Sequence, residues 1–251
     1  GRTNIEDYGF VQNGTDYYDG PANFAESFFA GYKPEEDKPF FLYLSFMNPH
    51  DICYGAGFDP RFPDKLRPHQ IAATQKYIDF HKTLSEEEYR NQIPPVPVNM
   101  EPNGAYAEMK EIGSGSRNWT EEQWNFYRWM YCRLVEDVEK QIGRILTALA
   151  DAGLADNTIV VFTSDHGEMG QSHGLVFKSQ LLEEATRTPL IIAGPGIQKG
   201  IVDSENLTCG IDLVPTMCDL VGIPIPKGLL GKSLKPILTG QSVKMSRNHI
   251  I

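Results

Sequence analysis

Residues 120–163 constrain the fold of this chain more than any other stretch, because they predict a long helix followed closely by a buried strand. Thr120 and Gln123 form the pattern of a capping box, in which each side chain satisfies a backbone amide at the start of a helix. Apolar residues then recur at spacings of three and four from Trp124 to Leu149, as on the buried face of an amphipathic helix. We expect the helix to end near Ala152–Gly153, where the glycine favours termination.

Continuous apolar runs at residues 40–46, 158–163 and 189–193 predict three strands that are buried on both faces. Shorter helical patterns follow at residues 180–186 and 212–221. Because the predicted helices and strands alternate along the chain, we expect an α/β fold with a mostly parallel central sheet and helices on both of its faces.

The stretch SDHGEMGQSHGLVFK, residues 164–178, begins where the run at 158–163 ends. His50 likewise closes the first of the three predicted strands. In open α/β sheets, ligands bind beyond the carboxyl ends of the strands. We therefore expect His50, Asp165 and His166 to lie at the edge of the sheet where a ligand binds.

Asp165 and His166 place a carboxylate beside an imidazole at this edge. Such a pair could ligate a divalent metal if other segments of the chain contributed further ligands. An aspartate in this position could equally cap the following turn, next to a histidine that faces solvent. The two residues alone do not decide between these interpretations.

Lys178, His173 and His50 are the residue types that bind an oxyanion. At about 4 Å and an effective dielectric constant near 20, a lysine ammonium attracts an anionic oxygen by roughly 4 kcal/mol before desolvation. A histidine could donate a hydrogen bond to the anion or protonate a leaving group. The alternatives are a solvated surface lysine and two structural histidines.

The other charged residues of this region carry structural predictions. Glu183, Glu184 and Arg187 stand at helical spacing and predict a local ion pair that holds the loop. Glu168 could be a metal ligand or an acid, but we expect it to be an exposed carboxylate of the loop.

Residues 53–118 contain many prolines and predict an irregular insertion, with one helix between 69 and 90. Long irregular segments more often face a substrate than form part of a core. The formal net charge of -10 argues against a general nucleic-acid or anionic-membrane surface. The apolar runs are also far shorter than a membrane span.

Four segments in this order resemble the sulfatase family of the alkaline-phosphatase superfamily: PFFLYLSFMNPH (39–50), residues 139–178, EEATRTPLIIAGPGI (183–197) and residues 212–234. The resemblance implies an alkaline-phosphatase-like fold and hydrolysis of a sulfate ester, expected on a sulfated small molecule or glycan. It also implies one divalent cation, usually Ca²⁺, with Asp165 and His166 among its ligands. By the same resemblance Lys178 and His50 contact the sulfate, His50 can serve the leaving group, and His173 lies close to the substrate.

The chain departs from the family pattern in one important respect. Sulfatases attack with a formylglycine made from the first residue of a Cys/Ser-x-Pro/Ala-x-Arg motif, and no Cys or Ser of this sequence stands in that context. We therefore expect a fragment, with residues 1–236 from the catalytic domain and 237–251 leading into a smaller C-terminal subdomain. The nucleophile would come from an upstream segment, and the family resemblance favours a periplasmic, extracellular or lysosomal protein.

Two other functions stay open at this stage. A phosphodiesterase, phosphonate hydrolase or headgroup transferase of the same superfamily would share the strand followed by Asp-His-Gly. A relative without catalytic activity that binds sulfated glycans would explain the missing nucleophile motif. The context of His50 and Lys178 favours the sulfatase.

Overall fold

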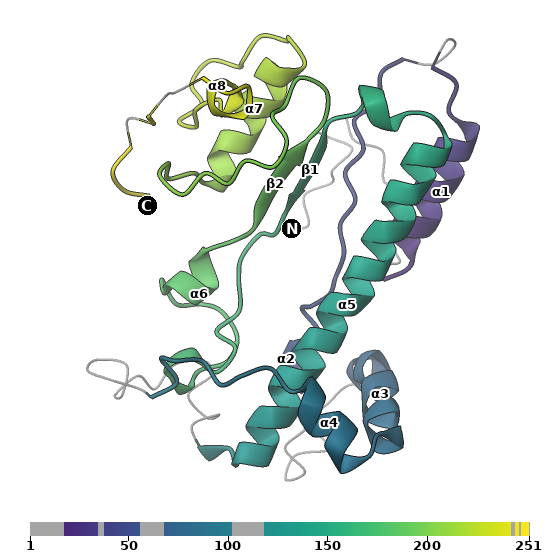
Figure 1. The fold of residues 1–251 in the computed structure, drawn as a ribbon, viewed down its shortest axis with the longest axis vertical. Coiled ribbons are helices and arrows are strands. Elements are labelled where there is room, and N and C mark those ends of the chain that lie inside the picture. Colours follow the sequence, from purple (N-terminus) through teal and green to yellow (C-terminus); the bar gives the residue numbers. More distant parts are fainter. Residues whose placement is uncertain are drawn as a thin grey trace. The chain divides into compact units, whose positions relative to one another are not determined.

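The computed structural model describes residues 18–34, 38–55, 68–101, 118–241, 244–245 and 247–250. The chain divides into two compact units (Figure 1). Unit 1 comprises Gly1–Gly153 and His166–Arg187, and unit 2 comprises Leu154–Asp165 and Thr188–Ile251.

Unit 1 is built around the long helix α5, Glu121–Asp151, whose predicted bounds are confirmed. The capping box is present: the Thr120 side chain accepts from the Gln123 amide, and Gln123 accepts from the Thr120 amide at 2.8 Å. One face of α5 lies in the core, because large apolar side chains recur along it. The buried members of this core are Ile52, Tyr77, Tyr89, Trp124, Tyr127, Trp129, Met130, Leu134 and Val176.

Helix α1, Gly20–Gly31, lies beside α5 in Figure 1. The two are joined by Arg144, whose guanidinium nitrogens lie 2.8 and 2.7 Å from the Glu26 carboxylate. This helix was not predicted, although Asp19 at its N-cap and Pro21 in its first turn are signals of a helix start. The other helices of unit 1 are α2 (Ile52–Gly55), α3 (Pro68–Thr83), α4 (Glu86–Gln92), the short 3-10 turn Ser172–Gly174 and α6 (Glu183–Thr186).

The expectation of an irregular insertion at 53–118 is corrected in part, and the helix expected between 69 and 90 is confirmed by α3. Helices α3 and α4 fill much of its described portion, and α4 starts with its own capping box, Ser85 to Glu88. Residues 93–101 have no helix or strand, as expected. Residues 56–67 and 102–117 lie outside the described part of the chain.

Unit 2 contains two strands, β1 (Val160–Thr163) and β2 (Leu190–Ala193), in the predicted places. They pair antiparallel, with Val160 opposite Ala193 and Thr163 opposite Leu190. The predicted mostly parallel sheet is thus not seen among the described residues. An apolar run can indicate a strand but does not encode the direction of its partner, and every second residue of β2 is in fact exposed, as in half-covered antiparallel pairs.

The predicted strand at 40–46 is also not found as a strand. These residues make no ladder in the described structure, and the side chains of Phe41 and Tyr43 are 62% and 74% exposed. Apolar composition alone therefore gave the wrong expectation of burial on both faces.

The rest of unit 2 consists of the 3-10 turns Ala155–Asn157 and Gly210–Asp212 and the helices α7 (Leu213–Leu220) and α8 (Lys235–Leu238). Helix α7 confirms the predicted helix at 212–221 to within one residue at each end. The division predicted near residue 236 stays a prediction. Among the described helices, none combines the length and the apolar character needed to cross a membrane.

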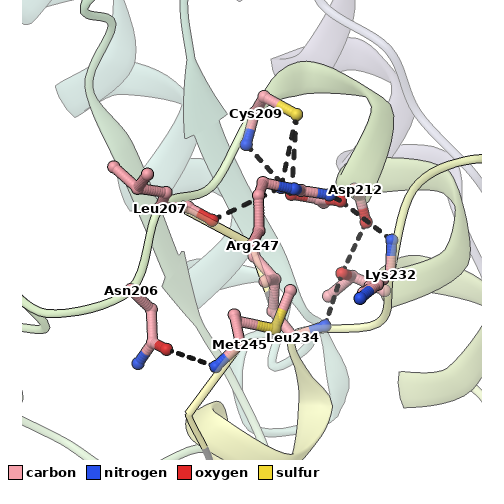
Figure 2. Close-up of polar contacts among 9 residues, drawn as sticks. Asn206, Leu207, Cys209, Asp212, Lys232, Leu234, Met245 and Arg247 are labelled. Atoms are coloured by element: carbon pink, nitrogen blue, oxygen red, sulfur yellow. Dashed lines mark hydrogen bonds and ion pairs between the residues drawn. The ribbon is translucent and has the colours of Figure 1, made fainter. Parts of the chain in front are cut away.

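A buried ion pair fixes the C-terminal segment to the start of α7 (Figure 2). The Asp212 side chain is fully buried, and its two oxygens accept from the two terminal nitrogens of Arg247 at 2.6 and 2.8 Å. The amides of Cys209 and Lys232 donate to the same carboxylate at 3.0 and 2.8 Å. We call these four residues the C-terminal clasp; its hydrogen bonds satisfy a charge that would otherwise be costly to bury.

Candidate anion-binding site

The loop at residues 166–180 belongs to unit 1 and docks on α6. The Gly167 amide donates to the Ala185 carbonyl at 2.8 Å. A Cβ atom on Gly167 would lie 2.0 Å from the carbonyl oxygen of Glu184, so the backbones approach more closely than a side chain allows. This approach explains why a glycine follows His166.

Four residues of the loop that are not glycine have positive φ: Gln171 at 85°, His173 at 56°, Phe177 at 70° and Ser179 at 103°. Such conformations cost about 1 to 3 kcal/mol each and persist only where the surrounding structure enforces them. Lys178 lies between two of these residues. The loop therefore holds His173, and the two residues that flank Lys178, in conformations that a free chain rarely adopts.

Lys178 extends to the helical turn that follows His50. Its Nζ lies 3.8 Å from Cys53 Sγ, and the Cys53 amide donates to the His50 carbonyl at 3.0 Å. Burial raises the pKa of the Cys53 thiol, and the Lys178 charge opposes this rise. The His50 side chain is 41% exposed, and its Nδ1 atom is buried. The structure thus brings Lys178 to α2, the element that His50 precedes.

His173 is held by Asn99, a residue of the insertion that the sequence did not indicate. The His173 amide donates to the Asn99 carbonyl at 2.8 Å, and Asn99 Nδ2 lies 3.4 Å from His173 Nε2. The same Nδ2 donates to Glu184 Oε1 at 2.6 Å. Burial of Glu184 opposes its ionisation, but hydrogen bonds from its own amide and from Asn99, with the nearby His173, hold its pKa below the usual range.

Glu168 is not the exposed carboxylate that we expected. It is half-buried, and its Oε1 accepts from the Tyr127 hydroxyl at 2.6 Å and from the Phe177 amide at 2.5 Å. Tyr127 lies in the core on α5. Glu168 therefore joins the loop to the hydrophobic core of unit 1.

The predicted metal ligands are Asp165, the last residue of a segment assigned to unit 2, and His166, the first residue of a segment assigned to unit 1. Asp165 is exposed, and His166 Nδ1 lies 2.8 Å from the Gly167 carbonyl oxygen. Among the described residues, no group of three or more His, Cys, Asp and Glu side chains could hold a metal ion. Because Ca²⁺ takes six to eight oxygen ligands, a calcium site at these two residues would need further ligands.

The predicted ion pair beside the site is confirmed. Arg187 Nη1 lies 2.7 Å from Glu183 Oε1 across one turn of α6. Both side chains are exposed, so the pair contributes little to stability. Glu184, which we expected to share this pair, instead binds Asn99.

The comparison with known proteins matches residues 4–223 to the family model described as Sulfatase. Arylsulfatase K from Danio rerio is 31% identical over 217 residues, which cover 84% of this chain and 38% of that protein. The delta 4,5-hexuronate-2-O-sulfatase of Bacteroides thetaiotaomicron is 32% identical over 217 residues, covering 85% of this chain and 43% of that protein. A solved 2-O GAG sulfatase shares the fold with a TM-score of 0.68 and 28% identity, covering 96% of this chain and 51% of its own.

Proposed function

The chain belongs to the sulfatase family, and from this premise we propose that it carries the anion-binding part of an enzyme that hydrolyses sulfate esters. It spans about two fifths of the length of the curated relatives reported above, with 38% and 43% covered. The observation that carries the proposal is the position of Lys178, whose ammonium group is held at the helical turn after His50.

In this proposal Lys178 pairs with the oxygens of the sulfuryl group and neutralises the charge that moves with it. His50 donates a hydrogen bond to the sulfate and protonates the leaving-group oxygen. His173, oriented by Asn99, lies next to the bound substrate and donates a further hydrogen bond. These roles use the residue types for which sulfate binding was predicted.

We assign Asp165 and His166 as two ligands of a divalent cation, Ca²⁺, by their likeness to the family pattern. When bound, such a cation supplies positive charge against the sulfate. His166 is the weaker assignment, because Ca²⁺ prefers oxygen ligands. The nucleophile is proposed to be a formylglycine outside these 251 residues, since the sequence has no Cys/Ser-x-Pro/Ala-x-Arg motif.

The proposed substrate is a sulfate ester of a carbohydrate. Two of the similar proteins are named as sulfatases of a 2-O position, one of a hexuronate and one of a glycosaminoglycan. We accordingly propose a 2-O-sulfated uronate as the first substrate to try. We propose a periplasmic, extracellular or lysosomal compartment for the enzyme, which the family resemblance supports.

The test is a turnover assay of the full-length protein on 2-O-sulfated disaccharides, with a phosphonate monoester and a phosphodiester as competing substrates. We expect hydrolysis of the sulfate ester, and a loss of about 100-fold or more in kcat/KM for Lys178→Ala and for Asp165→Ala. Lys140→Ala, which removes an exposed lysine of α5, is the matched control and should match the wild type.

Faster turnover of the phosphonate or the phosphodiester would instead favour a phosphoryl-transfer enzyme of the superfamily. Binding of sulfated glycans without any turnover would favour the non-catalytic relative. Unimpaired sulfatase activity in both variants would reject the assigned residues.

A further inference from the structure

We propose that Glu168 is a positioning residue, which acts with Tyr127 to fix the turn that presents Lys178. This inference rests on the proposed function, because it assumes that Lys178 binds the sulfate. The contacts that support it do not depend on that function. Glu168 was expected to be an exposed loop residue, and none of the roles assigned above uses it.

The first support is that both backbone groups of Phe177, the residue before Lys178, are hydrogen-bonded to Glu168 and Met169. Glu168 Oε1 accepts from the Phe177 amide at 2.5 Å. The Met169 amide donates to the Phe177 carbonyl at 2.9 Å. Two hydrogen bonds to one residue fix the plane and direction of the backbone there, and the direction of the backbone determines where the next side chain starts.

The second support is that Glu168 is itself hydrogen-bonded to a residue of the core of unit 1. The Tyr127 hydroxyl donates to the same Oε1 at 2.6 Å, and Tyr127 is only 2% exposed. Burial and the Glu168 charge raise the pKa of Tyr127 well above its ordinary value, so the hydroxyl remains a donor at any physiological pH. Val176, next to Phe177, belongs to the same core.

The third support is the strain on both sides of Lys178. Phe177 and Ser179 have φ values of 70° and 103°, which side chains rarely tolerate without enforcing contacts. The bond from Glu168 to Phe177 is such a contact. Without it, the turn would be free to relax and to move the Lys178 ammonium group away from Cys53 and from the helix that follows His50.

A glutamate in this place could also act by its charge, as an acid or a ligand. The two roles differ in what a glutamine would do, because its carbonyl oxygen can still accept from Phe177 and Tyr127 but carries no charge. A positioning role predicts that Glu168→Gln keeps most of the activity and that Glu168→Ala does not.

The experiment is a double-mutant cycle in the full-length protein, measured as kcat/KM for a sulfated disaccharide. We expect Glu168→Ala to lower kcat/KM on the order of 10- to 100-fold, as small misplacements of a binding group do. Glu168→Gln should stay within about threefold of the wild type. In a Lys178→Ala background, Glu168→Ala should cost less than about threefold more, because the group that it positions is gone.

Tyr127→Phe removes only the hydroxyl that donates to Glu168, and it tests the same contact if Glu168→Ala does not fold. It should lower kcat/KM by about three- to tenfold in the wild type and have no effect in the Lys178→Ala background. Effects that multiply fully in the double variants, or a Glu168→Gln as impaired as Glu168→Ala, would overturn the inference.

Amide hydrogen exchange of the peptide containing Phe177 gives a readout that needs no activity. Exchange there should accelerate in Glu168→Ala but not in Glu168→Gln, with the amides of α5 unchanged in both. If the wild type hydrolyses no sulfate ester, the proposed function falls and exchange alone decides the inference. Unchanged exchange in Glu168→Ala would overturn the positioning role even where the sulfatase activity is established.

Discussion

The loop that holds Lys178 in unit 1 and the C-terminal clasp of unit 2 are both organised by a carboxylate, but the two carboxylates have different partners. Asp212 is fully buried and is paired with the guanidinium group of Arg247. Glu168 accepts from neutral donors, the Tyr127 hydroxyl and the Phe177 amide. The Asp212 arrangement neutralises a buried charge and attaches the C-terminal segment to α7. The Glu168 arrangement instead fixes the backbone at Phe177, the residue before Lys178.

The two regions also differ in which residues adopt positive φ. In the described part of unit 2, every residue with positive φ is a glycine, from Gly194 to Gly240. The loop of unit 1 instead places four other residues in that region, among them His173. Glycine takes these conformations without a steric cost, and other residues do not. Backbone strain is thus concentrated in the loop that carries the candidate anion-binding residues, His173 and Lys178.

The largest effect that would separate the two regions is expected from Asp212→Asn. Removing one partner of a buried ion pair leaves the other uncompensated, and we expect a loss of about 3 kcal/mol in the free energy of unfolding of unit 2. Urea unfolding followed by thiol labelling of Cys209 measures it, because Cys209 Sγ lies 3.4 Å from the Arg247 side chain.

Asp156→Asn, an exposed aspartate of the same unit, is the control for this variant. The kcat of the folded Asp212→Asn protein should equal that of the wild type. A normal midpoint of Cys209 labelling, or a specific loss of kcat, would erase the contrast between a structural clasp and a functional loop.

The second largest effect is expected from acid, which should weaken the C-terminal clasp. Burial opposes the ionisation of Asp212, but the hydrogen bonds from Arg247 and from the amides of Lys232 and Cys209 lower its pKa from 3.8 to about 2. Because the folded pKa is lower, the contribution is complete above the unfolded pKa and is lost as the pH falls from about 4 to about 2. It amounts to about 2 kcal/mol.

Unfolding measured between pH 5 and pH 2 tests this expectation. The stability difference between the wild type and Asp212→Asn should shrink across that window. A difference that stays constant down to pH 2 would mean that the ion pair does not set the pKa of Asp212.

The smallest effect concerns the thiol beside Lys178. Since the Lys178 charge opposes the burial that raises the Cys53 pKa, Lys178→Met should raise this pKa further. Alkylation proceeds through the thiolate, so Cys53 should react several-fold more slowly at pH 8. Mass spectrometry of the peptides that contain Cys53 and Cys132 measures both alkylation rates. The rate of Cys132, a half-buried cysteine of α5, should be unchanged. Equal Cys53 rates in both proteins would mean that Lys178 is not held at α2.

Local signals accounted for the elements that the sequence predicted well. The Thr120–Gln123 capping box and the regular spacing behind it gave both ends of α5, and two short apolar runs gave the positions of β1 and β2. Each of these signals lies within the element that it describes. The direction of the strand pair does not, because it depends on a partner elsewhere in the chain; the described pair is antiparallel, and the predicted parallel sheet is not seen among the described residues.

The missing parts of the site have the same explanation. Glu168 meets Tyr127 across 41 positions of sequence, and Asn99 meets Glu184 across 85. No pattern near any of these residues indicates its partner. The resemblance to the sulfatase family supplied the roles of His50, Lys178 and Asp165, which are proposals until they are measured.

Binding of inorganic sulfate to the full-length protein tests most directly the claim that the Lys178 loop forms an anion site. Calorimetric titration with sodium sulfate should give a dissociation constant that is at least about tenfold weaker for Lys178→Ala, since one charged contact to the anion is lost. Lys140→Ala should bind as the wild type does. Equal affinity in the wild type and Lys178→Ala would contradict the account, because the held ammonium group would then have no part in binding the anion.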